Sequence, residues 1–468
     1  MEPVLAVDFG STYTKAVLFD LAGADVVGVA HAPSTVGSDV TLGLREALAK
    51  LREATGVDAA RVRALACSSA AGGLRIAVVG LVPALSLEAA RRAALGAGGK
   101  IVAAYGFKLT PDRLRDLIAL RPDIVILAGG TDGGDEETIL HNAAALARSP
   151  LGAPVIVAGN ACVADACVER LREGGKAVHV GANLLPEVGR VEVDEVHRII
   201  RELFIGHITR AMGIDRVREH VDLAGDILPT PSAVLEAARL LADGAGATTG
   251  LGDTVVVDVG GATTDVHSIA AGTPTRPGVV QRGLPELRVK RTVEGDLGMR
   301  VNAPTIVERF GRAQLAALAG GAPDAGAESE VDRYAQHVAE HTEHVPRSDA
   351  ERALDHALGR AAVRIAMQRH AGTVREVFTA SGTALVQEGK DLSDVAALVG
   401  VGGVLAHGSD ARVILEAALG RGADPAALLP RAPKLYLDRR YVLFGVGLLS
   451  SIARDAAYAV ARRVLQPL

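Results

Sequence analysis

The sequence predicts an α/β protein of two lobes, with a further α/β block inserted into the first lobe. The chain has 468 residues, which is too long for one hydrophobic core, so two or more domains are expected. An apolar strand followed by Asp, Gly and small hydroxyl residues occurs near the start and again after residue 250. Between the two copies, strand and helix patterns alternate over residues 70–205. These three observations define the predicted fold class.

The composition is that of an ordinary globular protein, with 49% hydrophobic and 22% charged residues. The net charge of -5 is spread along the chain without a basic tract, so we expect no nucleic-acid partner. No apolar run reaches the roughly 18 residues of a membrane span, and the start has no basic signal region. We therefore predict a cytoplasmic protein without a membrane segment. Its three cysteines, Cys67, Cys162 and Cys167, are expected to be reduced and buried.

The first lobe is predicted to begin with a meander of three short strands. Residues 3–9, 14–20 and 24–31 are rich in branched apolar residues and are separated by turn residues. A helix is expected over residues 38–54, where leucines and alanines form an apolar stripe. Another short buried strand is expected at residues 64–69.

The block at residues 70–205 is predicted to be a parallel sheet with helices on both faces. Its candidate strands are apolar throughout and are separated by helical stretches, which is the pattern of parallel strands. The candidate strands are residues 74–82, 100–107, 123–130, 153–159 and 176–182.

The first lobe is predicted to end near residue 250, which gives domains at residues 1–250 and 251–468. A proline-containing loop is expected at residues 225–233, with a helix after it. Residues 318–331 are rich in Gly, Ala and acidic residues and are predicted to form a mobile surface loop.

The rest of the second lobe is predicted to be mainly helical. Buried strands are expected near residues 376–381 and 397–405. The chain is expected to close, over residues 434–465, with a strand and then one long terminal helix.

The first chemistry-bearing motif lies between the first two predicted strands. Gly10 frees the turn backbone, while Ser11 and Thr12 supply hydroxyl and N–H groups. Lys15 adds a cation, and Asp8 at the strand end is placed to hold a metal ion or its water. Taken alone, this motif also fits a simple polar β-hairpin.

The second motif runs from Asp258 to Asp265 and repeats the same layout. The pair Gly260 and Gly261 permits positive φ at the turn and close approach of the backbone to a ligand. An acid at the strand end, small hydroxyl residues and bare backbone suit a phosphate group with a divalent metal. Two such hairpins, each opening a domain, are far less expected by chance than one.

Two facing phosphate hairpins resemble the actin, Hsp70 and sugar-kinase superfamily. The resemblance implies two ribonuclease-H-like lobes, with ATP and magnesium bound in the cleft. It also implies an adenosine site at a glycine pair late in the second lobe, which Gly402 and Gly403 match. In that superfamily a helix packs closely against the first lobe at the hinge, and Gly445 and Gly447 suit such a helix.

Within the superfamily, the whole chain is similar to the glutamate mutase L family. The motifs that carry the similarity are residues 5–20, 127–146, 155–167, 257–268 and 438–449. The resemblance implies an ATP-dependent reactivating or chaperone factor for adenosylcobalamin-dependent carbon-skeleton mutases, whose subunits would be its partners. The chain lacks the D-x-H-x-x-G cobalamin signature, so it is not expected to be the mutase itself.

The resulting hypothesis is an ATP-binding, ATP-hydrolysing protein whose lobes close on the nucleotide. Asp8 and Asp258 are predicted to be the catalytic and metal-binding residues, positioning Mg²⁺ and the attacking water. The predicted residues for binding ATP or ADP are Gly10, Ser11, Thr12, Thr14, Lys15, Gly260, Gly261, Thr263, Thr264, Gly402 and Gly403.

Three other functions stay open at this point. A small-molecule kinase on the same fold needs a general base for a substrate hydroxyl, and no residue is identified for that role. A hydantoinase- or oxoprolinase-like ATP-dependent amidohydrolase has a similar phosphate hairpin. A nucleotide-regulated scaffold would bind ATP with negligible turnover.

Two further stretches are ambiguous. Residues 129–137 follow a buried strand with glycines and acids, which favours helix capping and a protein-contact loop over a small-ligand site. His337, His341 and His344 have the spacing of one helix face, which zinc is able to use. The many charges nearby and the lack of a further carboxylate ligand favour a solvated helix face.

Overall fold

The computed structural model describes residues 1–10, 12–35, 38–69, 74–208, 214–321, 325–379, 382–408, 410–422 and 424–468. The chain divides into two compact units. One unit contains Met1–Ala70, Met212–Arg282 and Glu286–Leu468, and the other contains Ala71–Ala211 with Gly283–Pro285.

The first sheet of the larger unit begins with an antiparallel meander. Its strands are β1 (Pro3–Phe9), β2 (Tyr13–Asp20) and β3 (Asp25–Pro33). Parallel strands then extend the sheet on the other side of β1: β4 (Arg63–Ser68), with β10 (Asp222–Leu223) and β11 (Leu228–Pro229) both paired to β4. Helix α1 (Val40–Thr55) begins after Asp39, whose side chain accepts the Thr41 amide, and ends at Gly56 with φ of 72°.

The second sheet repeats this order of strands and directions. Strands β14 (Thr254–Val259), β15 (Thr264–Ile269) and β17 (Val289–Glu294) form the antiparallel half. Strands β20 (Ala397–Val401) and β21 (Lys434–Asp438) follow in parallel beside β14, and β22 (Leu465–Pro467) closes the edge. The repeated topology confirms the predicted class of two related α/β lobes.

Three helices share one hydrophobic core with both large sheets. These are α7 (Thr230–Asp243), α14 (Leu443–Leu449) and α15 (Arg454–Val464). The other face of the second sheet packs against a separate core of helices. These helices are α8 (Ala303–Phe310), α9 (Arg312–Leu318), α10 (Ala325–Glu340), α11 (Asp349–His370), α12 (Gly403–His407) and α13 (Ala411–Leu415).

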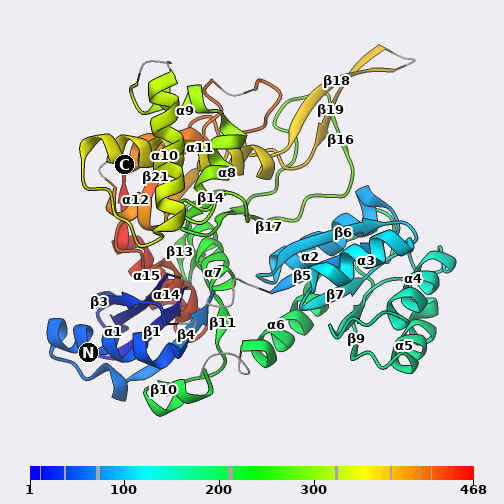
Figure 1. The fold of residues 1–468 in the computed structure, drawn as a ribbon, viewed down its shortest axis with the longest axis horizontal. Helices are drawn as coiled ribbons and strands as arrows, with labels where there is room; N and C mark the ends of the chain where they lie inside the picture. Colours follow the sequence, from blue (N-terminus) through cyan, green and yellow to red (C-terminus); the bar gives the residue numbers. More distant parts are fainter. Residues whose placement is uncertain are drawn as a thin grey trace. The chain divides into compact units, whose positions relative to one another are not determined.

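Two small sheets complete the larger unit. The first is the short pair β12 (Gly244–Ala245) and β13 (Thr248–Thr249). The second contains β16 (Val279–Arg282), β18 (Thr373–Thr379) and β19 (Gly382–Glu388). Figure 1 shows β18 and β19 as a ribbon that extends away from helices α8 and α11.

The smaller unit is the inserted block, and its five strands are all parallel in the order β6-β5-β7-β8-β9. The strands are β5 (Arg75–Gly80), β6 (Lys100–Gly106), β7 (Ile124–Leu127), β8 (Val155–Val157) and β9 (Val178–Val180). The helices are α2 (Glu88–Gly96), α3 (Pro111–Leu120), α4 (Glu137–Ala147), α5 (Ala164–Glu173) and α6 (Asp194–Ile208). The predicted α/β insertion is therefore confirmed.

Two predicted loops are in part helical. Residues 318–331 were expected to form a loop, but α10 begins at Ala325, where Ala and Glu have high helix propensity. Helix α7 begins at Thr230, inside the predicted loop at residues 225–233, with a proline in its first turn where the missing N–H costs little.

Three details of the remaining predictions are wrong. The terminal segment contains two helices, α14 and α15, and a final strand in place of one long helix. The strand predicted as buried near residues 376–381 belongs, up to Thr379, to the exposed ribbon, in which Phe378 is 86% exposed; residues 380–381 lie outside the described ranges. Cys67 and Cys167 are buried as expected, but Cys162 is exposed.

Within the described ranges, every helix is too short or too polar to cross a membrane.

Candidate functional site

The two hairpin turns have the same internal hydrogen bond. The Gly10 amide donates to the Tyr13 carbonyl at 3.0 Å, and the Gly260 amide donates to the Thr263 carbonyl at 2.9 Å. A Cβ on Gly10 would lie 2.6 Å from the first carbonyl, and one on Gly260 would lie 3.0 Å from the second. Glycine is thus needed for space at residue 10, and a side chain at residue 260 would be in tight contact with the carbonyl. The expectation of positive φ at Gly260 and Gly261 is wrong, since neither is among the positive-φ glycines.

The turns of the two hairpins lie against each other. A Cβ on Gly261 would be 3.6 Å from Thr12 Oγ1 and 3.7 Å from Arg300 Cγ. The Arg300 guanidinium is held by Asp355 through bonds of 2.8 and 3.1 Å. The two copies of the motif, which lie about 250 residues apart in the sequence, therefore meet in one place.

A charged side chain from the first hairpin is held by groups distant in sequence. Asp8 stands opposite Lys15 in the β1–β2 register, and Lys15 Nζ lies 3.2 Å from Asp8 Oδ2. Asp8 Oδ1 accepts the hydroxyl of Thr230, at the start of α7, at 2.6 Å. Cys67 Sγ on β4 is 3.6 Å from the same oxygen, and burial, followed by the Asp8 charge, raises the pKa of its thiol.

Lys15 lies between this carboxylate and the C-terminal part of the chain. Its Nζ is 3.6 Å from the centroid of the Tyr441 ring and 5.9 Å from that of Phe444. Burial lowers the pKa of the Lys15 ammonium, but electrostatic interactions with Tyr441, Asp8 and Asp258 outweigh burial and raise it. Lys15 is therefore charged.

Asp258 contributes a buried oxygen without a protein partner. Its Oδ1 is buried and has no hydrogen bond among the described residues. Burial, followed by the neighbouring Asp265 carboxylate, raises the pKa of Asp258 to about 7. Because buried polar atoms are normally satisfied, this oxygen fits a ligand such as Mg²⁺ or its water. Magnesium commonly takes one or two carboxylates and completes its shell with phosphates and water, which matches this donor set.

Asp438 is a second buried acid near the site. Its Oδ2 accepts the amides of Val442 and Leu443 at 2.8 and 2.7 Å, while Oδ1 has no partner in the described part of the chain. Burial raises the pKa of Asp438 to about 6, against the opposing effect of these amides. Asp438 thereby fixes the turn that precedes α14.

Asp265, which stands opposite Asp258 in the register, is already neutralised by protein groups. Arg291 on β17 donates to Asp265 Oδ1 from Nη2 at 2.6 Å and from Nε at 3.1 Å. The Thr263 hydroxyl donates to Asp265 Oδ2 at 2.8 Å. Asp258 is therefore the acid of the second hairpin that is left for a ligand.

Two of the predicted phosphate-binding residues lie on the other face of their strands. Thr14 is buried, with its hydroxyl 3.1 Å from the position that a Cβ on Gly43 of α1 would take. The Thr264 hydroxyl donates to the Leu297 carbonyl at 2.7 Å. Because successive side chains of a strand point to opposite faces, neither hydroxyl joins Asp8, Lys15 and Asp258. Ser11 lies outside the described residues.

The two glycine pairs of the second lobe have different surroundings. A Cβ on Gly402, whose φ is 106°, would lie 2.2 Å from the Val259 carbonyl, so strand packing explains this glycine. Gly403 has open space on its Cβ side. A Cβ on Gly445 would be 2.7 Å from Phe19 Cζ, and one on Gly447 would be 1.8 Å from the Ala233 carbonyl. The expected close packing of this helix on the first lobe is confirmed.

The residues of the site that were not predicted from the sequence include Thr230, Arg291, Asp438 and Tyr441. Thr230 lies where a loop was expected, and Arg291 reaches the site only through strand pairing. Asp438 and Tyr441 belong to the motif at residues 438–449, which is the signal that pointed to this segment.

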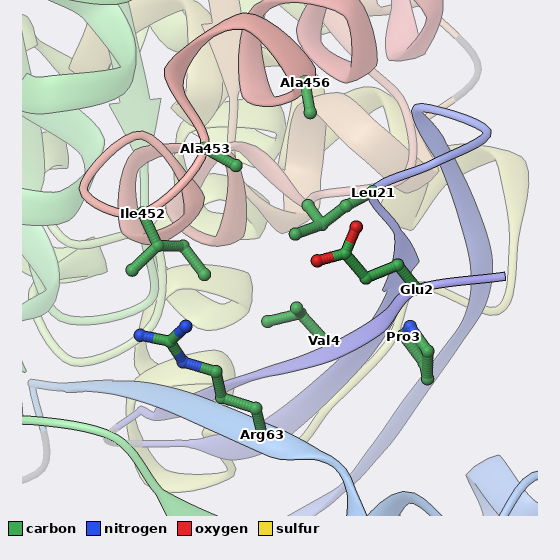
Figure 2. Close-up of a pocket in the computed structure, with 8 residues that line it drawn as sticks. All are labelled: Glu2, Pro3, Val4, Leu21, Arg63, Ile452, Ala453 and Ala456. Carbon is green, nitrogen blue, oxygen red and sulfur yellow. The ribbon is translucent and has the colours of Figure 1, made fainter.

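A surface pocket of about 330 Å³ lies away from the hairpin turns. It is lined by Glu2, Pro3, Val4, Leu21, Arg63, Ile452, Ala453 and Ala456, and Figure 2 shows Glu2 and Arg63 on either side of it. Pro3 and Arg63 begin β1 and β4, whereas the turn of the first hairpin follows the end of β1. We therefore define the candidate site by the hairpins and not by this pocket.

The two ambiguous stretches have internal partners. Asn160 accepts the Gly133 amide at 3.1 Å, and Asn183 donates to the Gly130 carbonyl at 3.1 Å and to Asp132 at 2.8 Å. His337 Nε2 lies 3.3 Å from His344 Nδ1. Over the ranges that the structure describes, no group of three or more His, Cys, Asp or Glu side chains is arranged to hold a metal ion.

We expect magnesium-dependent nucleotide binding to strengthen as the pH rises through 7. The pKa of Asp258 is raised to about 7, so below this pH the carboxyl is largely protonated and is a poor metal ligand. Protonated Asp258 also stabilises the folded protein relative to the unfolded chain. This contribution to the free energy of unfolding is fully present below about pH 4 and is lost as the pH rises to about 7. Titration calorimetry across this range, with Asp258→Asn as control, measures the effect; a wild-type profile as flat as that of the variant would contradict it.

Sequence comparison relates the whole chain to one family. The model of the family described as "MutL protein" matches residues 4–465. Protein MutL from Clostridium tetanomorphum is 40% identical over 467 residues, covering 99% of each chain.

Structure comparison gives weaker similarities. The activator of 2-hydroxyisocaproyl-CoA dehydratase from Clostridium difficile, with bound ADPNP, has 11% identity and a TM-score of 0.30, covering 99% of this chain and 98% of its own. Ligand-bound xylulose kinase from Lactobacillus acidophilus has 11% identity and a TM-score of 0.37, covering 100% of this chain and 93% of its own. At these TM-scores neither structure supports a functional inference.

Proposed function

The chain belongs to the MutL protein family, and on this premise we propose that it is an ATP-binding, ATP-hydrolysing accessory protein. Its proposed role is to reactivate or chaperone an adenosylcobalamin-dependent carbon-skeleton mutase such as glutamate mutase. Mutase subunits are then its partners, and the cytoplasm is its compartment.

The observation that carries the nucleotide part of the proposal is the meeting of the two hairpins. Gly261 of the second hairpin lies against Thr12 of the first. The Lys15 ammonium contacts Asp8 at 3.2 Å, and the charge of Asp258 also raises the pKa of Lys15. A cation between acids, at two crowded glycine turns, is an arrangement suited to a phosphate chain with a divalent metal.

In this proposal each residue has a role that follows from its chemical type. Lys15 offsets phosphate charge, and the turns at Gly10 and Gly260 bring bare backbone close to the phosphates. Asp8 and Asp258 would hold Mg²⁺ and orient the attacking water, and Thr230 fixes the Asp8 carboxylate by donating its hydroxyl to it. When bound, Mg²⁺ would neutralise charge that develops on the phosphates. Catalysis then comes mainly from positioning and electrostatics.

We take the two lobes as residues 1–250 and 251–468. The proposed consequence of nucleotide binding and hydrolysis is a change in the arrangement of these lobes. ATP and ADP must favour different lobe arrangements, because a ligand shifts only an equilibrium in which it binds the two states differently. Helix α14 belongs to the core that contains residues of both large sheets, so it is the natural element to carry the change. The inserted unit is proposed to transmit it to the mutase.

ATP turnover with candidate partners tests the proposal. We expect turnover to rise when a cobalamin-dependent mutase carrying damaged cofactor is added, and not with sugars or polyols. A Lys15→Met variant, which keeps the length of the side chain but removes its charge, should lose the response. Stimulation by a sugar alone would favour a kinase, and ATP-dependent opening of a cyclic amide would favour an amidohydrolase. Binding without any turnover would leave a nucleotide-regulated scaffold.

A further inference from the structure

We propose that Tyr441 is a positioning residue that holds the Lys15 ammonium before nucleotide binds and reports the arrival of phosphate to helix α14. This inference rests on the proposed function, because it takes Lys15 as the cation that serves the phosphates of ATP.

The contact between Lys15 and Tyr441 has the geometry of a cation–π interaction. Lys15 Nζ lies 3.6 Å from the ring centroid, well within the range of about 6 Å over which such pairs attract. The Lys15 side chain is only 17% exposed, so water screens this contact weakly. The same ammonium is 3.2 Å from Asp8 Oδ2. Phosphate must therefore draw the cation away from groups that already hold it.

The backbone of Tyr441 is in an uncommon conformation. Its φ of 52° lies in the left-handed region, which bulky residues rarely adopt. Such a conformation persists only where the surroundings determine it, and it is frequent at switch regions and ligand clamps. Here the Tyr441 amide donates to the Asp438 carbonyl at 3.2 Å, and the Asp438 side chain accepts the next two amides. The turn thus places the ring over Lys15 at a cost in backbone strain.

The ring is joined directly to the helix that packs on the first lobe. Tyr441 lies two residues before α14, and Gly445 of that helix packs on Phe19. Phe19 and Lys15 are both on β2. Tyr441 and Gly445 therefore contact the same strand of the first lobe. Gly447, two residues after Gly445, packs on Ala233 of α7. A movement of Lys15 off the ring therefore changes the packing at the beginning of α14.

The test measures Mg-ATP affinity in two variants at the same position. Tyr441→Leu removes the ring that competes with phosphate, so we expect binding to become tighter by about 2-fold to 30-fold, the range to which cation–π energies correspond. Tyr441→Phe keeps the ring but loses the hydroxyl, which also interacts with the ammonium, so its affinity should lie between those of the wild type and Tyr441→Leu. In a Lys15→Met background, Tyr441→Leu should have no further effect, because the interacting cation is gone.

A second measurement uses only the wild-type protein and does not depend on the folding of a variant. Hydrogen exchange of residues 441–449 should change when Mg-ATP binds. Unaltered exchange there in the wild type, or unchanged or weaker binding by a folded Tyr441→Leu protein, would overturn the inference while leaving the proposed function intact. Absence of ATP binding by the wild type would instead remove the proposed function, and the inference with it.

Discussion

Replacing Asp258 with Asn is expected to lower the rate of ATP hydrolysis by about 100-fold or more, the loss typical for removal of a preorganised electrostatic group. Asn keeps the size of the side chain but has no negative charge to hold Mg²⁺. Asp258 Oδ1 is buried without a protein partner among the described residues, so its charge is available to a ligand. The rate of phosphate release at saturating Mg-ATP is the measurement.

The matched control for this variant is Asp349→Asn, which makes the same chemical change at a side chain that is 98% exposed. The control should hydrolyse ATP at the wild-type rate. Equal rates for Asp258→Asn and the control would remove Asp258 from the catalytic site.

Replacing Gly447 with Ala is expected to destabilise the larger unit by about 3 kcal/mol, at the upper end of the range for an overpacked core. The added methyl carbon would lie 1.8 Å from the Ala233 carbonyl oxygen and 2.7 Å from its carbon. Both atoms belong to the backbone of α7, which cannot turn aside as a flexible side chain can. The free energy of unfolding from denaturant titration measures the effect.

Gly403→Ala is the control for this substitution, because Gly403 belongs to the same unit as Gly447 and a Cβ at Gly403 meets nothing within 4 Å. It should change the free energy of unfolding by no more than about 0.5 kcal/mol, as a typical surface substitution does. If Gly447→Ala were equally mild, α14 would not be packed on α7 as described.

The hairpins could be predicted because their information is local. The run of branched residues before Asp258 and the glycines after it specify a strand and a turn without reference to the rest of the chain. The side-chain alternation of a strand is also local, and it would have separated Thr14 from Lys15 and Thr264 from Asp265. This alternation places the hydroxyls of both threonines away from the face that holds Lys15 and Asp265.

The remaining residues of the site depend on tertiary structure. Thr230 reaches Asp8 because β11 pairs with β4 and delivers the start of α7 to the end of β1. Arg291 reaches Asp265 across the β15–β17 pairing. The left-handed backbone of Tyr441 follows from the turn that Asp438 organises. These contacts join segments that are distant in sequence, so the residue pattern of any one segment does not predict them.

The same distinction explains the errors in the secondary structure. In residues 318–331 glycine and proline outweighed alanine and glutamate in the loop prediction, although α10 buries Val331 and Tyr334 against the helical core. Helix α14 ends and α15 begins around Ser450–Ala453, where the sequence has no proline or glycine that would predict a break.

The central claim is that one nucleotide is held by hairpins from both lobes. Titration calorimetry with Mg-ATP on the wild type, Lys15→Met and Asp258→Asn tests it most directly, since each variant alters one hairpin only. The account predicts one site per chain in the wild type and a clear loss of affinity in both variants. Wild-type affinity in either folded variant would contradict a shared site.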